Sequence, residues 1–460
     1  MEKNKEGGGL FIYFAAFSVN LITFSAGSAY SWTSPVLPKL KDQLESPLLK
    51  PPTIAEESWI SSLTSLGALG APILAGILSE KIGRKRTLLA FSIPMLVSHA
   101  ITAFAGAIEL YFVARFLVGL GCGCVYSVVP NYLSEISEDR NRGLINCFMT
   151  LMITTGLMFN YVVGPFVTVM VLSFGNMVPL VLFLTLFAYF VPESPYYFIA
   201  RGDKSSAESS LVKLRGKQQV QKELLTMMSS VETVGGNRGS FKDIVKSKAL
   251  IKGLVICNGL MVIQQFSGIN AVLGFMEQIF ISSGSSIPAE YSAILVGGVQ
   301  MLTVIVSTQL IDRLGRKILL IISCGGSCIA LTSMGLYFYL KTNKFNVDAL
   351  FWLPLFSLIL YIISFNLGLS CVPWALMGEI FPTNLKSIAS TITTCFCLAL
   401  AFVITMFFPQ VSITLGMAPS FWGFSVFSLV GVLFTHVIVP ETKGKSMSEI
   451  QEILGARVPK

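Results

Sequence analysis

Twelve apolar segments follow one another along this chain, each roughly the 20 residues that an α-helix needs to cross a bilayer. Of the 460 residues, 53% are hydrophobic and only 13% are charged, which is more apolar than a soluble protein of this size requires. The segments predict an all-α membrane protein whose spans lie at about residues 10–31, 58–79, 88–108, 111–133, 144–165, 170–191, 253–280, 289–311, 318–340, 351–376, 387–409 and 417–439.

The distribution of positive charge predicts the orientation of these spans. MEKNKEGGG at the amino terminus has the charge order of a secretory signal, but the apolar run after it is too long and lacks a cleavage site, so we expect an uncleaved first span. The loops after even-numbered spans and the two tails hold 27 of the 33 Lys and Arg, and loops of the other parity hold five. Because basic loops face the cytoplasm, we expect both termini to be cytoplasmic in a multi-pass protein of the plasma membrane. The net charge of +8 then reflects topology and indicates no nucleic-acid partner.

A long polar segment divides the twelve spans into two sets of six. It carries eleven Lys and Arg, and its apolar residues recur at helical spacing, which predicts short amphipathic helices along the membrane surface. The lipid bilayer is the surrounding partner, and no obligate protein partner is indicated. We expect a first six-helix bundle at 1–192, a cytoplasmic helical linker at 193–252, a second bundle at 253–440 and a cytoplasmic tail at 441–460.

Three motifs of the first half return in the second half in the same order. Their separations are nearly constant, at about 232, 244 and 248 residues, which indicates parallel structural repeats with a binding site at their interface. The matched motifs are EKIGRKR (80–86) with DRLGRKI (312–318), SEIS (134–137) with GEIFPT (378–383), and VPESP (191–195) with VPETKG (439–444).

Together with RFLVGLGCG, QQFSGIN and PWALMGEIFP, these motifs cover nearly the whole chain and resemble the sugar porter family of the major facilitator superfamily. The resemblance implies a twelve-helix major facilitator fold and carriage of a small neutral sugar by alternating access. Within that family, WTSPVLPKL (32–40) and Thr150 resemble the insect facilitated trehalose transporter type. The implied substrate is trehalose or a hexose, and no cofactor is implied.

The chain also departs from the pattern of many glucose transporters. Cys397 and Leu398 stand where many such porters have an Asn-Trp pair, and Gly274 and Phe275 stand where they have two tyrosines. Asn366 and Thr150 replace a common Glu and Gln. The resemblance therefore does not carry over glucose specificity.

The candidate sugar site consists of uncharged polar or aromatic residues at mid-membrane positions. Carboxamides both donate and accept hydrogen bonds, which suits sugar hydroxyls, and they carry no charge. A buried polar group without a partner costs about 1–3 kcal/mol, so these side chains must face a wet cavity or one another. The alternative for any one of them is a hydrogen bond that only joins two helices. The set is Gln264, Gln265, Asn270, Gln300, Trp374, Asn366 and Thr150.

Two of these positions carry local geometric expectations. On an ideal helix Gln264 and Gln265 point about 100° apart and Asn270 points about 140° beyond Gln265, so a helix break at Ser267 and Gly268 is needed to bring Asn270 to the same cavity. Trp374 can stack on a sugar ring, with Pro373 producing a kink before it. Its alternative role is that of an aromatic packed at a bend.

Charged residues at the inner ends of the spans are candidates for a gate. In each repeat, a glycine turn places an Arg and a Lys where they can meet Glu135 or Glu379, and such pairs across the cytoplasmic face would join the halves while the cavity is open outward. The alternative is that the basic residues only fix orientation at the lipid headgroups. The gating set is Arg84, Lys85, Glu135, Arg142, Arg316, Lys317 and Glu379, with Gly268 and Phe275 at the outer gate.

The first span bears on energy coupling. It contains no acid, whereas proton-driven relatives carry a carboxylate there, and Arg115, the usual partner of that acid, is present without it. We therefore expect facilitated diffusion, with a proton symporter that uses Glu277, or a sugar sensor that does not transport, as alternatives. GLGCGC (119–124) lies inside an apolar span, and no P-loop, H-E-x-x-H or G-x-S-x-G motif occurs, so we expect neither an enzyme nor a metal site.

Overall fold

The computed structural model describes residues 9–138, 141–217, 219–235, 243–244, 247–445 and 447–455. Within them, twelve helical stretches are long and apolar enough to cross a membrane, which confirms the predicted number. The stretches are Leu10–Ser31, Ile54–Ile82, Arg84–Ala103, Ile108–Ile136, Gly143–Phe166, Val169–Phe190, Lys248–Ser283, Ala289–Ser307, Arg316–Thr342, Asp348–Ile380, Leu385–Thr414 and Met417–Val437.

The helices before the second half are α1 (Gly9–Ser31), α2 (Thr33–Lys41), α3 (Ile54–Leu69), α4 (Ala71–Ile82), α5 (Arg84–Ala103), α6 (Ile108–Ile136), α7 (Arg142–Val163), η1 (Gly164–Phe166), α8 (Val169–Phe190), α9 (Pro195–Ala200), α10 (Lys204–Arg215) and α11 (Gln221–Gly235). Those of the second half are α13 (Lys248–Phe266), α14 (Ile269–Ser283), α15 (Ala289–Leu314), α16 (Arg316–Thr342), η2 (Asp348–Leu350), α17 (Leu353–Leu367), α18 (Val372–Ile380), α19 (Thr383–Thr414), α20 (Met417–Val437) and α21 (Met447–Ile453).

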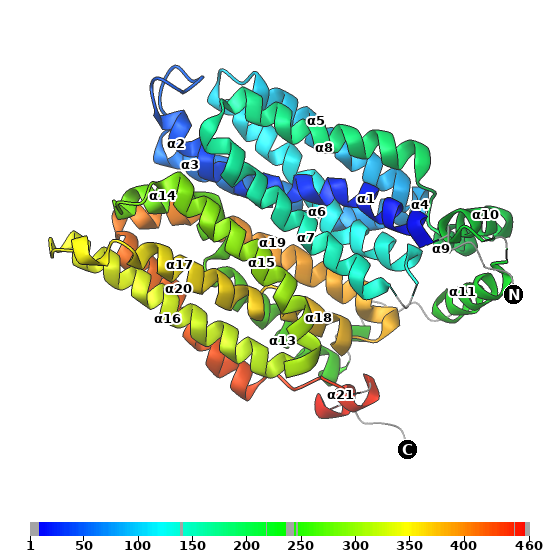
Figure 1. The fold of residues 1–460 in the computed structure, drawn as a ribbon. Helices are drawn as coiled ribbons and strands as arrows, with labels where there is room; N and C mark the ends of the chain where they lie inside the picture. Colours follow the sequence, from blue (N-terminus) through cyan, green and yellow to red (C-terminus); the bar gives the residue numbers. More distant parts are fainter. Residues whose placement is uncertain are drawn as a thin grey trace, which may run out of the picture.

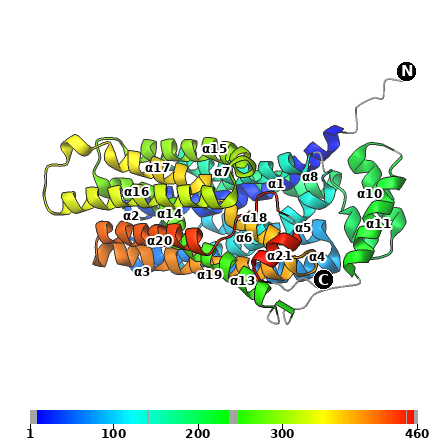
Figure 2. The same ribbon diagram turned by 90° about the horizontal axis from the view of Figure 1, so that it is seen from below.

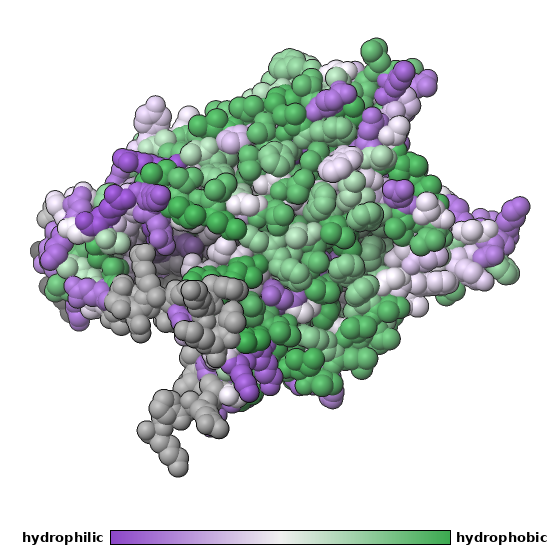
Figure 3. All heavy atoms as spheres, turned by 180° about the vertical axis from the view of Figure 1, so that it is seen from behind, coloured by the Kyte–Doolittle hydropathy of each residue, from purple (hydrophilic) through white to green (hydrophobic). Residues whose placement is uncertain are grey.

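The spans run roughly side by side, so the bundle has two distinct ends (Figures 1 and 2). We call the end that carries α9, α10, α11 and α21 the linker face, and both ends of the described chain lie there. The opposite end, with α2 and the loops at 42–53 and 343–352, is the loop face. Figure 3 shows a broad hydrophobic belt between two polar ends, as expected for a protein that crosses a bilayer.

Glycines allow the closest helix contacts in the first half. A Cβ on Gly27 of α1 would lie 2.0 Å from the carbonyl oxygen of Ile153 on α7, and a Cβ on Gly156 of α7 would lie 2.0 Å from that of Phe24. In the GLGCGC segment, a Cβ on Gly119 would lie 2.2 Å from the carbonyl oxygen of Thr64. The small residues that superficially resemble a nucleotide loop are therefore packing residues between α6 and α3.

Three spans contain a break. The second span changes from α3 to α4 at Gly70, the seventh changes from α13 to α14 at Ser267 and Gly268, and the tenth changes from α17 to α18 at residues 368–371. Pro373 lies in the first turn of α18, where proline is tolerated because its missing N–H has no helical acceptor. Backbone groups at such breaks are free to bond side chains from other spans.

The linker helices form their own small apolar cluster on the linker face, built around Ala207, Leu211 and Leu224. Arg215 at the end of α10 fixes this cluster to the first half. Its guanidinium donates to the Ile136 carbonyl at 2.7 Å and to Glu223 at 2.6 Å. The buried Arg215 thus joins α10, α11 and the end of α6.

Candidate functional site

The break in the seventh span is the local feature that builds the site. Gly268 has φ +87°, a left-handed conformation that glycine adopts without strain, and it separates α13 from α14. A Cβ at this position would lie 2.4 Å from the ring of Phe424. The predicted helix break at Ser267 and Gly268 is confirmed.

The break brings three predicted carboxamides together with Cys397, which the sequence marked only as a departure from the glucose-transporter pattern. Asn270 donates to the side-chain oxygen of Gln265 at 2.5 Å, although the two would point to different faces of a continuous helix. Gln265 in turn donates to the Cys397 sulfur at 3.1 Å, and that thiol lies 3.8 Å from the Gln264 side-chain oxygen. Gln264, Gln265 and Cys397 are all buried.

The breaks of the seventh and tenth spans meet through Gln264. Its amide donates at 2.6 Å to the carbonyl of Leu369, which is free because it lies between α17 and α18. The Leu369 N–H bonds the Ser323 hydroxyl at 2.9 Å. One carboxamide therefore fixes two discontinuous helices to each other.

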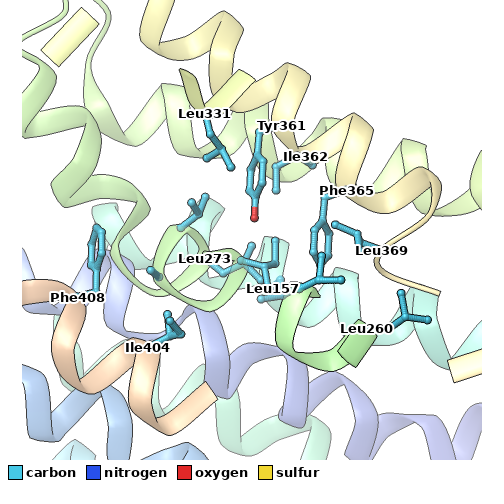
Figure 4. Close-up of a cluster of buried hydrophobic side chains, with 14 of the residues drawn as sticks. Leu157, Leu260, Leu273, Leu331, Tyr361, Ile362, Phe365, Leu369, Ile404 and Phe408 are labelled. Carbon is cyan, nitrogen blue, oxygen red and sulfur yellow. The ribbon is translucent and has the colours of Figure 1, made fainter. Parts of the chain in front are cut away.

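Tyr361 of α17 supports the break from the other side. Its hydroxyl donates to the Ser267 carbonyl at 3.0 Å and lies 3.3 Å from the Ser267 hydroxyl. Figure 4 shows Tyr361 among the buried apolar side chains of this region, with its hydroxyl directed toward the ribbon of α13 and α14. This arrangement satisfies the backbone that the break exposes.

The other four candidates lie on neighbouring helices. Gln300 and Asn366 are buried, and the Gln300 side-chain oxygen and the Asn366 side-chain nitrogen have no hydrogen-bond partner among the described residues. Trp374 on α18 is half-buried against the main apolar cluster, and Thr150 on α7 is half-buried. Unpartnered buried amide atoms are groups that a hydroxylated ligand could satisfy.

The residue that follows Cys397 packs against the first half of the chain. Leu398 belongs to an apolar cluster built mainly from first-half residues, including Ile22, Val125 and Leu180. The site therefore lies near the interface between the two sets of six spans, where the repeat predicts it.

On the loop face, α14 closes against the first half. The Thr33 hydroxyl donates to the Gly274 carbonyl, and the Tyr161 hydroxyl donates to the Leu273 carbonyl, both at 2.8 Å. A Cβ at position 274 would lie 3.1 Å from the Thr33 hydroxyl oxygen, so glycine permits this approach. Phe275 interrupts the helical dihedrals of α14 and packs, fully buried, against Phe408 at a centroid distance of 5.4 Å.

Arg115 carries the buried charge nearest to the first span. Its guanidinium donates to the carbonyls of Ala29 at 2.8 Å and Ile60 at 3.1 Å and lies 5.0 Å from the centroid of the Trp32 ring. Backbone carbonyls and a π-face thus take the place of a carboxylate partner.

The charge pairs predicted for the linker face form within each half. Arg84 pairs with Glu135 at 2.9 Å, and Arg316 pairs with Glu379 at 2.8 Å. The predicted contacts between these charged residues are therefore present. Neither pair joins the two halves in this state, however, so an ion pair between the halves remains a prediction for another state. The side chain of Arg142 lies outside what the structure describes.

Two further acids on this face were missed as site residues. Glu193 accepts hydrogen bonds from the backbone N–H groups of Arg84 and Lys85, and Glu441 does the same for Arg316 and Lys317. Each carboxylate thereby satisfies free donors at a helix N-terminus, and it is favoured there by the helix dipole. The Pro-Glu pair that recurs in VPESP and VPETKG could have identified them.

Gly268→Ala tests the break. The substitution forces a left-handed alanine, which costs about 1–2 kcal/mol, and it also places a methyl group against Phe424. We expect a lower Tm for the purified protein in detergent. Gly70→Ala is the matched control, because Gly70 also lies at a helix junction but has φ −88° and nothing within 4 Å of the added Cβ. Equal Tm values for the two variants would contradict a break that requires glycine at position 268.

Comparisons with known proteins place these features in a family. The model for the family described as "Sugar (and other) transporter" matches residues 7–454. The facilitated trehalose transporter Tret1-2 homolog of Drosophila sechellia is 36% identical over 97% of this chain and 91% of its own length. The facilitated trehalose transporter Tret1 of Bombyx mori is 33% identical over 95% of this chain and 85% of its own.

Solved structures agree on the fold. The inward-open xylose transporter XylE from E. coli superposes with a TM-score of 0.80, at 22% identity, over 96% of this chain and 99% of that one. The proton:xylose symporter XylE bound to 6-bromo-6-deoxy-D-glucose gives a TM-score of 0.76, at 22% identity, over 97% and 100%. The predicted twelve-helix major facilitator fold is confirmed.

Proposed function

The chain belongs to the sugar transporter family, and we propose that it carries a neutral sugar across the membrane by facilitated diffusion, as a uniporter. The observation that carries this proposal is the Gln265, Asn270 and Cys397 network at the break between α13 and α14. It supplies uncharged donors and acceptors at mid-membrane depth, and Gln264 lies beside it. Groups of this kind can replace the water around sugar hydroxyls without presenting a buried ion.

In the structure, the amide of Gln265 bonds a partner that a sugar hydroxyl can replace. Sulfur is a weak hydrogen-bond acceptor, so the amide of Gln265 loses little when it leaves Cys397 for a sugar hydroxyl. The unpartnered amide atoms of Gln300 and Asn366 stand on α15 and α17 as further binding groups. We assign Trp374 to stacking on the sugar ring and Thr150 to the first-half side of the site.

Transport requires the loop face to open and the linker face to close. We propose that α14 swings about Gly268, which breaks the bonds of Thr33 and Tyr161 to the backbone of α14. The bundles at 1–192 and 253–440 then rock against each other around the fixed site, joined by the linker at 193–252. In the opposite state, the basic residues of one half meet Glu135 or Glu379 of the other.

We propose trehalose as the first sugar to test, because the curated relatives at 33% to 36% identity are named facilitated trehalose transporters. A hexose is the second candidate. The linker face is assigned to the cytoplasm from the excess of Lys and Arg on it, and the protein to the plasma membrane. Protease protection of the linker in sealed cells tests this orientation.

Counterflow in proteoliposomes tests the function and the site together. We expect labelled trehalose or one of the hexoses glucose and fructose to exchange against the same unlabelled sugar. Gln265→Ala removes the side-chain amide, and the loss of one hydrogen bond to the sugar, worth about 1–1.4 kcal/mol, should raise the half-saturating sugar concentration about 5–10-fold. Gln410→Ala, which removes an exposed carboxamide, is the control and should leave that value unchanged.

Exchange of none of these sugars would contradict transport and favour the sensor alternative. Equal effects of Gln265→Ala and Gln410→Ala would place the binding site elsewhere.

An imposed proton gradient tests the uncoupled mechanism. The first span, Gly9–Ser31, contains no Asp or Glu that could exchange a proton, and Arg115 is bound by carbonyls rather than by a carboxylate. We expect the initial uptake rate into proteoliposomes to be the same with and without an inward proton gradient. A strong acceleration that a protonophore abolishes would show a symporter instead.

A further inference from the structure

A hollow lies on the linker face, away from the candidate sugar site. It has a volume of about 540 Å³ and is formed where the end of α4 and the first turns of α5 meet α9. Three basic side chains line it, those of Lys85, Arg86 and Arg201, beside the aromatic rings of Tyr197 and Phe198. In Figure 1, α9 and α10 lie beside the end of α4.

Both acidic side chains that line this hollow accept hydrogen bonds from backbone N–H groups. Glu193 accepts the N–H groups of Arg84, Lys85 and Ser194, and Asp203 accepts the Ser206 N–H at 3.0 Å as the cap of α10. Both carboxylates bind helix N-termini, and the three basic side chains leave the hollow with one more positive than negative charge.

The basic side chains, in contrast, are held by neutral groups. Lys85 donates to the Ala188 carbonyl at 2.7 Å. The Arg201 guanidinium lies 5.3 Å from the centroid of the Tyr197 ring and donates to the Lys81 carbonyl. Among the described residues, no hydrogen bond or ion pair involves the exposed Arg86 side chain. A concave site with a surplus of cations concentrates field lines and attracts anions.

The internal repeat shows which residues of the hollow also occur at the equivalent turn of the second half and which do not. In the second half, Lys317 donates to the His436 carbonyl at 2.7 Å, as Lys85 does to that of Ala188, and Glu441 repeats the role of Glu193. The position of Arg86 is occupied there by Ile318, which is 53% exposed. Folding of the repeated turn therefore does not require an arginine at that position.

The depth of the hollow indicates the source of the anion. The apolar belt of α8 ends at Tyr189 and Phe190, which are 81% and 54% exposed, and the Ala188 carbonyl bonded by Lys85 lies in the same turn. Exposed aromatic rings are typical of the boundary between hydrocarbon and headgroups. Basic pockets at this level on the cytoplasmic side suit phosphorylated headgroups.

We propose that this hollow binds the phosphoryl group of an anionic phospholipid headgroup, with Arg86 and Arg201 as its principal ligands and the rings of Tyr197 and Phe198 as its wall. The binding is independent of sugar in the opposite site. It ties α9, and through α10 the linker, to the lipid surface next to the turn that carries Arg84.

The test is a titration of the full-length protein in neutral detergent with water-soluble dioctanoyl phosphatidylinositol 4-phosphate, followed by thermophoresis. We expect saturable one-site binding that Arg86→Gln and Arg201→Gln each weaken about fivefold. Lys222→Gln, which removes an exposed charge on α11, should change the Kd less than twofold. If Arg86→Gln lowers the Tm, Arg86→Ile takes its place, because it copies the residue of the folded second repeat.

The second arm of the titration uses inositol 1,4-bisphosphate, which has the headgroup phosphates without acyl chains. Weaker binding of this probe than of the lipid supports a headgroup site. Equally tight binding would overturn the lipid assignment in favour of a soluble phosphate. No saturable binding of either probe, or equal weakening by Lys222→Gln, would overturn the site itself.

Discussion

Hydrocarbon offers a carboxamide no partner, so Gln264, Gln265 and Asn270 of the seventh span need partners inside the protein. The break at Ser267 and Gly268 makes this possible, because it turns Asn270 back toward Gln265 and leaves Gln264 directed at the Leu369 carbonyl. That carbonyl is itself free only because the tenth span is broken. Two discontinuous helices thus supply each other with hydrogen-bond partners.

The same break also separates α14 from α13 on the way to the loop face. Beyond Gly268, α14 meets the first half through the carbonyls of Leu273 and Gly274, which accept hydrogen bonds from Tyr161 and Thr33. Each hydroxyl-to-carbonyl hydrogen bond contributes only about 1 kcal/mol net. These two bonds therefore make only a weak contact between α14 and the first half. On the linker face the charge pairs join helices within each half, α5 to α6 and α16 to α18.

Much of this arrangement was predictable from the sequence. Span number follows from apolar length, and the helix break follows from a Ser-Gly pair inside a polar motif. The long-range partners were not predictable, because nothing near Cys397 or Tyr361 in the sequence indicates that they contact the seventh span. The charge pairs were predicted by residue type, but the prediction placed them across the two halves, whereas the structure forms each pair within one half. Glu193 and Glu441 occupy equivalent positions of a repeated sequence motif. Only the fold shows from which backbone N–H groups their carboxylates accept hydrogen bonds.

The central claim is that α14 must leave α2 before sugar can enter from the loop face. Thr33→Cys with Gly274→Cys tests it, because a Cβ at 274 would lie 3.1 Å from the Thr33 hydroxyl oxygen, close enough for a disulfide to form between the new thiols. The measurement is sugar counterflow in proteoliposomes before and after oxidation, with each single variant oxidised in parallel as a control for the native thiols. The account predicts that oxidation of the double variant alone stops exchange and that a reductant restores it. If the fully cross-linked protein exchanged sugar as fast as the same variant before oxidation, the result would contradict this claim.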